Sequence, residues 1–115
     1  MNQSIPPFKD IEAAHKRISG KINKTPVHTS SYLNELTDVD LYFKCENFQK
    51  TGSFKFRGAT NAVMQLGKEE MKNGVGTHSS GNHAAALALA ASMSGIDAHI
   101  VMPENSNPAK IKAVE

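Results

Sequence analysis

The chain has 115 residues, of which 39% are hydrophobic and 21% are charged, a composition typical of a globular domain and not of a disordered segment. Its 13 basic and 11 acidic residues leave a net charge of +2, an excess too small to indicate a nucleic acid or a membrane as partner. The single cysteine, Cys45, excludes an internal disulfide framework and fits a reducing compartment. No apolar run is long enough to cross a bilayer and the polar start is no signal peptide, so we expect a cytoplasmic protein.

The first half of the sequence predicts two helices and one strand. An apolar stripe predicts a helix over 9–19, and Ser30 and Ser31 can cap a short helix that follows them. The aromatic and apolar residues of 40–45 (DLYFKC) are typical of a strand. The polar stretch 46–52 then predicts a loop.

The second half alternates helices with short strands. Helices are predicted over 53–66 with Ser53 as N-cap, over 68–73 and 82–94, and from Asn107-Pro108 onward, and strands over 75–78 and 98–102. This alternation indicates a parallel α/β arrangement, and the apolar strands fit a sheet covered on both faces. The last helix has a start signal but no stop signal before Glu115, so we expect it to be an interrupted element.

Lys55, in the segment Thr51–Ala59 (TGSFKFRGA), is the first candidate for chemistry. If Ser53 caps the helix, Lys55 lies in the first turn, where the positive end of the helix dipole disfavours a cation. The charged form of Lys55 would be disfavoured further by the nearby charges of Lys50 and Arg57 and by desolvation from the flanking phenylalanines. A neutral lysine amine can form a Schiff base with a carbonyl. The alternative is a solvated surface lysine whose stem packs over the phenylalanines.

The second candidate is Ser79–His83 (SSGNH), between a predicted strand and a predicted helix. Its small residues let a ligand approach the backbone, and the amides that open the helix favour a carboxylate or a phosphate. The hydroxyls of Ser79 and Ser80 and the amide of Asn82 add possible hydrogen bonds. The alternative is ordinary helix capping by Ser80 or Asn82, and the sequence leaves both open.

The sequence matches no other catalytic or metal template. It contains no complete G-x-G-x-x-G, no G-x-x-x-x-G-K-[ST] loop and no G-x-S-x-G elbow. His78 and His83 have no third ligand at a recognised spacing. We therefore expect no metal site in this chain.

Taken together, Lys44–Ala59 (KCENFQKTGSFKFRGA) and Ser79–His83 resemble the serine racemase and serine/threonine dehydratase family of fold-type II pyridoxal-phosphate enzymes. The resemblance implies the tryptophan-synthase-β-like fold, a three-layer α/β structure with a parallel sheet. It covers the whole chain but only about the first third of a typical member. It thus implies that 1–52 packs on an absent large domain and that 53–115 forms most of a truncated small domain.

The resemblance also implies roles for individual residues. Lys55 matches the lysine that forms a Schiff base with pyridoxal phosphate, Phe54 matches the residue that packs on the cofactor ring, and Asn82 matches the asparagine that hydrogen-bonds the ring hydroxyl. Ser80 matches the serine that acts as acid/base on the face opposite the lysine in serine racemases. The loop that holds the substrate carboxylate contains Ser79, Ser80, Asn82 and His83.

The implied reaction is β-elimination of L-serine or L-threonine to a 2-oxo acid and ammonia, with or without serine racemisation. The freed Lys55 would take the α-proton while the cofactor stores the electrons. Hydroxyaspartate dehydratases look similar at Ser80, so this serine does not settle the reaction. The resemblance further implies a small amino-acid substrate, a homodimer at full length, and a divalent cation held by later parts of the full-length enzyme.

Four positions match the nucleotide site of nucleotide-activated members of the family: Ser30, Ser31, Lys50 and Thr51. Ala85 departs from the family, which usually has a glutamine near the nucleotide there. The glycine-rich phosphate loop, the group facing the pyridine nitrogen and the metal-binding carboxylates match no segment of this chain. The alternative function is therefore a non-catalytic α/β module that binds a carboxylate or a nucleotide, and we expect the 115-residue chain alone to be inactive.

Overall fold

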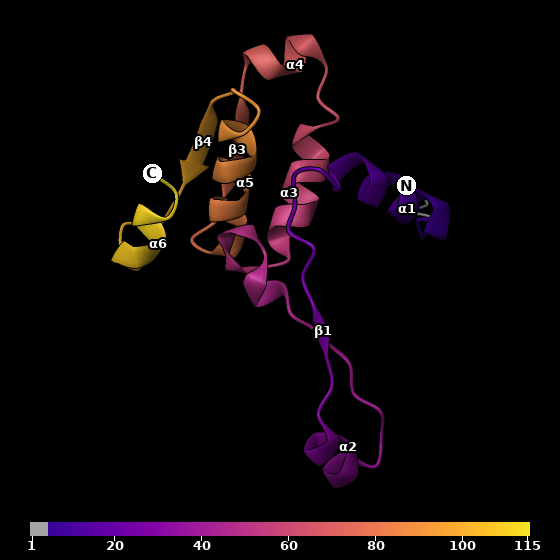
Figure 1. The fold of residues 1–115 in the computed structure, drawn as a ribbon. Helices are drawn as coiled ribbons and strands as arrows, with labels where there is room; N and C mark the ends of the chain where they lie inside the picture. Colours follow the sequence, from indigo (N-terminus) through magenta and orange to yellow (C-terminus); the bar gives the residue numbers. More distant parts are fainter. Residues whose placement is uncertain (1–4) are drawn as a thin grey trace.

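The structure, a computed structural model, describes residues 5–115 and shows a body from which an arm projects (Figure 1). We define the arm as residues 27–44 and the body as residues 50–115, with the first helix packed against it. The elements in chain order are α1 (Phe8–Ile18), β1 (Val27–His28), α2 (Ser31–Thr37), β2 (Phe43–Lys44), the 3₁₀ helices η1 (Glu46–Phe48) and η2 (Lys50–Gly52), α3 (Lys55–Val63), α4 (Lys68–Lys72), β3 (Val75–His78), α5 (Asn82–Ser92), β4 (Ala98–Val101) and α6 (Pro108–Lys112).

The centre of the body is a β–α–β unit. β3 and β4 pair in parallel, with Val75 opposite Ala98 and His78 opposite Val101, and α5 connects them. α5 lies between this sheet and α3, which it also contacts. Alanine is the best helix former, and a helix that is apolar all round belongs in an interior. The buried residues of α5 are Ala84, Ala85, Ala86, Leu87, Ala90 and Ala91.

The core of the body forms where α3 meets α5. Phe56 and Val63 of α3 are fully buried, and together with Ala59 they pack against α5. Burying one such phenylalanine stabilises a fold by about 3 kcal/mol. The small side chains of α5 let α3 approach closely, so this contact fixes where the start of each helix lies.

The predicted α/β class with a parallel sheet is confirmed, but the expectation that its strands are covered on both faces is wrong for the described residues. Exposure alternates along both strands, and the outward face, made of Gly76, His78, His99 and Val101, is exposed. Val101 alone keeps 62% of its surface exposed. The reason is that α5 crosses one face only, and an apolar strand sequence cannot show which face lacks a cover.

The arm is a two-stranded antiparallel ribbon that carries α2. Val27 lies opposite Lys44 and His28 opposite Phe43, so the strand predicted over 40–45 is shorter than expected, and β1 was not predicted. The arm makes the molecule 52 Å long, with a radius of gyration of 17.0 Å, against about 13 Å for a compact chain of this size. The molecule is therefore extended because of the arm.

The remaining helices follow the predictions with shifted ends. α1 packs against α3, where Arg17 Nη1 donates to Asn61 Oδ1. α6 begins after Asn107, whose Oδ1 accepts a hydrogen bond from the Ala109 amide at 2.9 Å, as the cap signal predicts. α6 is assigned as Pro108–Lys112, and the Glu115 amide still donates to the Ile111 carbonyl at 3.3 Å, so the expected interruption of this helix stays a prediction. Among the described residues, no helix combines the length and apolarity needed to cross a membrane.

Candidate active site

Both segments singled out in the sequence meet at one end of the body. α3 and α5 begin at this end, and the parallel strands β3 and β4 point their carboxyl ends toward it (Figure 1). Ligands of parallel α/β structures bind at this edge of the sheet. Ser79–His83 follows β3, and η2, which leads into α3, contacts α5. The fold therefore places Lys55 and Ser79–His83 around the same edge, which we call the site edge.

Lys55 is the first residue of α3 and is exposed, which confirms its predicted place in the first turn. Its Nζ lies 5.3 Å from the centroid of the Phe54 ring, and Phe54 is 61% exposed. The contact is the one that the surface-lysine alternative predicts. What distinguishes Lys55 is its surroundings, because an aromatic ring with an open face and an amine lie side by side at the site edge.

The backbone before Lys55 is tightly turned. Thr51 has φ 61° and Gly52 has φ 67°, a left-handed conformation that is costly for a β-branched residue. Ser53 is extended, and its buried Oγ has no hydrogen-bond partner among residues 5–115. The predicted side-chain cap by Ser53 is therefore wrong. The Phe56 amide instead donates to the Ser53 carbonyl at 3.4 Å, so the backbone itself starts α3.

Ser79–His83 leaves the start of α5 open. Ser79 Oγ accepts a hydrogen bond from the Gly81 amide at 3.3 Å, which tightens the turn after β3. Gly81 occupies the N-cap position, and no side chain of residues 5–115 caps α5. The capping alternative for Ser80 or Asn82 is therefore wrong. Both residues are exposed, and the first-turn amides of α5 keep the partial positive charge that suits a carboxylate.

Arg57 does not add free positive charge next to Lys55, contrary to the sequence argument. Its Nε donates to Glu46 Oε2 at 2.8 Å and its Nη2 to Glu46 Oε1 at 2.7 Å. This bidentate pair holds the pKa of Glu46 down at about 2 and raises the pKa of Arg57. Residues two apart in a helix point about 200° apart, so Arg57 and Lys55 lie on opposite sides of α3.

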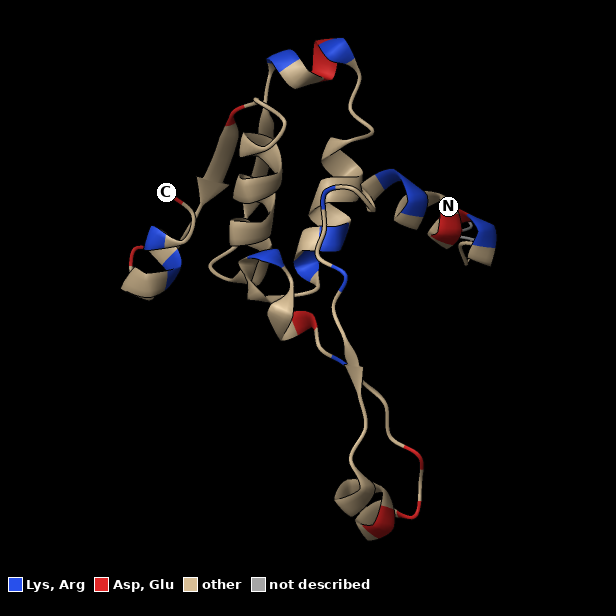
Figure 2. Ribbon diagram, in the orientation of Figure 1, with Lys and Arg blue, Asp and Glu red and all other residues tan. Residues whose placement is uncertain are grey.

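Lys110 of α6 is a residue that the sequence reasoning missed. Its Nζ donates to Asn82 Oδ1 at 2.9 Å across 28 positions of sequence. Asn107 and Pro108 predict where α6 begins, but nothing local in the sequence predicts which residue α6 meets. Figure 2 shows basic positions on η2, the start of α3 and α6 at the site edge, which suits an anionic ligand.

A family model described as "Pyridoxal-phosphate dependent enzyme" matches residues 18–115. The chain belongs to this family. Pyridoxal phosphate is therefore confirmed as the predicted cofactor. The part of the chain that the structure describes holds no cluster of three or more His, Cys, Asp or Glu side chains suited to a metal ion, and the divalent cation expected elsewhere stays a prediction.

Relatives within the pyridoxal-phosphate family are close in sequence and structure. The chain is 55% identical over 106 residues to a beta-hydroxyaspartate dehydratase of Paracoccus denitrificans, covering 92% of this chain and 34% of the relative. It is 54% identical over 107 residues to a serine racemase of Dictyostelium discoideum, covering 93% and 33%. The structure of maize serine racemase superposes with a TM-score of 0.92 at 46% identity, covering 96% and 34%. The chain thus spans about one third of the length of these relatives.

The four positions matched to a nucleotide site do not lie together in the structure. Ser30 caps α2 by accepting from the Leu33 amide at 3.3 Å, and Ser31 begins that helix. Lys50 and Thr51 lie in η2, at the opposite end of the arm (Figure 1). A nucleotide site formed by these four residues stays a prediction. It would need further contacts that join the two ends of the arm, and the described residues do not supply them.

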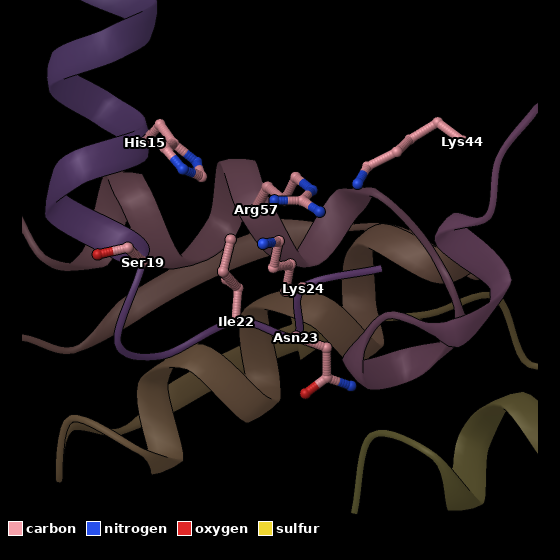
Figure 3. A pocket seen from close by; sticks show the side chains of 7 residues that line it. All are labelled: His15, Ser19, Ile22, Asn23, Lys24, Lys44 and Arg57. Atoms are coloured by element: carbon pink, nitrogen blue, oxygen red, sulfur yellow. The ribbon is translucent and has the colours of Figure 1, made fainter. Parts of the chain in front are cut away.

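A separate cavity of about 340 Å³ lies between α1, the segment 19–24, β2 and α3 (Figure 3). Two of its three Lys and Arg side chains are already engaged, because Arg57 pairs with Glu46 and Lys44 Nζ donates to the Thr25 carbonyl at 2.7 Å. None of the predicted site residues lines it, so we do not place the cofactor there. Its lining comprises His15, Ser19, Ile22, Asn23, Lys24, Lys44 and Arg57.

Proposed function

We propose that this chain supplies half of the active site of a pyridoxal-phosphate enzyme that removes the β-hydroxyl of a small amino acid. Serine, threonine and hydroxyaspartate are the candidate substrates, the products are a 2-oxo acid and ammonia, and serine racemisation is a second outcome. One observation carries the proposal: an exposed lysine with an open aromatic ring and an uncapped helix start share the site edge. The dehydratase and racemase names of the relatives support this chemistry.

The residues at the site edge fit the ring of the cofactor. We assign Lys55 Nζ to hold it covalently, the exposed face of Phe54 to pack on the ring, and Asn82 to hydrogen-bond the ring hydroxyl. The donor set supports the assignment, because an amine, an aromatic face and an amide are all solvent-accessible there. When bound, pyridoxal phosphate stores the electron pair left behind when the α-proton departs.

The start of α5 is assigned to the substrate carboxylate. Its first-turn amides and the hydroxyls of Ser79 and Ser80 can donate to a carboxylate and orient the substrate, with the half-buried His83 beside them. Lys55 Nζ is the group proposed to accept the α-proton. Ser80 Oγ, which is exposed, is proposed to hold or return a proton on the opposite side, and racemisation would depend on it.

Reduction with borohydride tests the assignment of Lys55 in the full-length protein. Borohydride fixes a Schiff base irreversibly, so peptide mass spectrometry of the reduced protein should find the cofactor on the peptide that contains Lys55. The Lys55→Ala protein should lose visible absorbance and turnover, by at least about a thousandfold because a covalent catalyst is removed. Lys68→Ala, an exposed lysine of α4, is the matched control and should keep both. Cofactor found on another lysine would contradict the proposal.

A further inference from the structure

Asn82 is held by a cation that reaches it from another element. The Nζ of Lys110 donates to Asn82 Oδ1 at 2.9 Å. An asparagine amide has one acceptor oxygen and one donor NH₂ group, whereas a lysine ammonium can only donate. The contact therefore decides which end of the amide faces α6. It leaves Nδ2 as the end that can serve a ligand, and among residues 5–115 the structure shows no acceptor for it.

The position of Lys110 follows from the fold. β3 and β4 are neighbouring parallel strands, so the segments after their carboxyl ends lie side by side. Asn82 opens α5 after β3, and Lys110 lies in α6 after β4. Asn107 fixes the start of α6 through its hydrogen bond to the Ala109 amide. The cap therefore fixes the start of α6, and Asn107 lies three residues before Lys110.

The orientation of this amide matters for a ring hydroxyl that can ionise. Oδ1 and Nδ2 are nearly equal in size, so sterics alone do not choose between the two orientations. With Oδ1 toward the ring, two oxygens would face each other, whereas Nδ2 would donate to the ionised oxygen. A hydrogen bond to a charged group is also stronger than a neutral one, and the ammonium on Oδ1 polarises the amide so that Nδ2 becomes a better donor.

We propose that Lys110 is a positioning residue that acts through Asn82: it turns Nδ2 toward the ring hydroxyl of the cofactor and favours the ionised form of that hydroxyl. The proposal rests on the proposed function, because it takes Asn82 as the partner of the ring hydroxyl. It makes no claim that Lys110 contacts the cofactor. A merely structural role, in which Lys110 tethers α6 to α5, predicts a different set of measurements.

The test uses the full-length protein with Lys110→Ala, Lys110→Arg and the matched control Lys112→Ala, which removes an exposed lysine of the same short helix. Three quantities are measured: the cofactor dissociation constant, the visible absorbance of bound cofactor across pH, and the melting temperature of the cofactor-free protein. We expect Lys110→Ala to weaken cofactor binding by about ten- to a hundredfold and to shift the pH profile of absorbance. Lys110→Arg should restore most of both, because a guanidinium also donates to Oδ1, and Lys112→Ala should change neither.

Two outcomes would overturn the proposal. In one, Lys110→Ala lowers the melting temperature of the cofactor-free protein while the absorbance profile stays that of the parent, which is the result of a tether. In the other, Lys110→Ala leaves all three quantities unchanged. Binding that weakens with an unchanged melting temperature and a shifted profile supports positioning.

An Asn82→Ala protein and the Lys110→Ala/Asn82→Ala double variant separate this proposal from the proposed function. If Lys110 acts through Asn82, the double variant binds the cofactor about as weakly as Asn82→Ala alone, since the two losses are not additive. If Asn82→Ala weakens binding and Lys110→Ala does not, only the role of Lys110 fails. If Asn82→Ala itself leaves binding and absorbance unchanged, the assignment of Asn82 in the proposed function fails as well.

Discussion

Glu46 joins the N-terminal segment of the chain to α3. Its carboxylate accepts two hydrogen bonds from Arg57 and one from the Thr25 hydroxyl, and its side chain is only 15% exposed. Thr25 itself is buried, and Lys44 Nζ donates to its carbonyl. These contacts bring two separate segments, one around Thr25 and one over 44–46, onto the side of α3 opposite Lys55. The cluster therefore sets the position of the helix whose first residue is the proposed cofactor lysine.

This cluster should make stability depend on pH. The Arg57 hydrogen bonds lower the pKa of Glu46 from 4.5 to about 2, so the charged carboxylate stabilises the fold fully above pH 4.5. That contribution declines as the pH falls from 4.5 through about 2, because the unfolded chain takes up the proton first. Glu46→Gln should lower the unfolding free energy at neutral pH by about 2 kcal/mol and flatten its pH dependence in this window, as urea denaturation across pH would measure.

The exposed pair of Glu69 and Lys72 provides the control. Glu69 is 84% exposed in its side chain, so Glu69→Gln should change the unfolding free energy by less than about 0.5 kcal/mol. A Glu46→Gln protein that kept the slope of the parent between pH 2 and 4.5 would show that the Arg57 pair does not set the acid stability.

At the scale of single residues, local sequence was enough to single out Lys55 and Asn82 as candidates and not enough to predict the long-range pairs around them. Lys55 stands out because a cation opens a helix between two phenylalanines, and both features are local. The Arg57–Glu46 and Lys110–Asn82 pairs join residues 11 and 28 positions apart. Such pairs exist only once the helices have packed, so charge and spacing along the chain do not reveal them.

Among the elements, β3 depends on a close approach at its start. Gly74 has φ 71°, and a Cβ there would lie 2.5 Å from the Asp97 carbonyl oxygen, whereas Gly95 has φ 68° and open space around it. Both glycines adopt the left-handed conformation, so replacing either by alanine costs about 1 kcal/mol or slightly more. Gly74→Ala should cost a further 1–3 kcal/mol or so, because the backbone of the β3–β4 pair must move.

Gly95→Ala is thus a matched control for Gly74→Ala, and urea denaturation of both proteins measures the difference. The Val75 amide donates to the Asp97 carbonyl at 2.8 Å, so the clash also acts on the first hydrogen bond of the parallel pair. Equal losses of stability in the two variants would mean that the backbones near Gly74 and Asp97 can separate at no cost.

The elements that sequence predicted well are those with their own start and stop signals. β3 matches its prediction of 75–78 and α5 begins at the predicted Asn82, because the turn residues of 79–81 and the alanines that follow mark these boundaries locally. β1 and β2 are two residues each and exist through their pairing with each other, so no periodicity announces them. The alternation of helices and strands predicted the parallel pairing of β3 and β4, but their uncovered face depends on which elements pack against the sheet, and composition cannot show that.

The whole molecule exposes more surface than a compact chain of its length. Its accessible surface is 8488 Å², against about 6,100 Å² expected from its mass. Large apolar side chains on the arm contribute, with Tyr32 71% and Leu36 68% exposed. Exposed apolar groups gathered on one projecting element indicate a surface that another part of a protein covers. This supports the proposal that 1–52 packs on further domain structure, as expected from a chain that spans one third of its relatives.

The 115-residue chain expressed alone should therefore self-associate through its exposed apolar side chains and be inactive. We expect it to bind a hydrophobic dye such as ANS, to self-associate in size-exclusion chromatography with light scattering, and to keep no visible absorbance after incubation with pyridoxal phosphate and desalting. Replacing Tyr32 and Leu36 by serine should reduce dye binding and association, because these two side chains lie on the arm. Ile5 and Phe8, which are 91% and 71% exposed but lie outside the arm, are the control positions, and replacing them should have a smaller effect because they do not belong to the apolar group on the arm. If the chain is a monomer that does not bind the dye and retains the cofactor, the site edge binds pyridoxal phosphate without any further part of the protein.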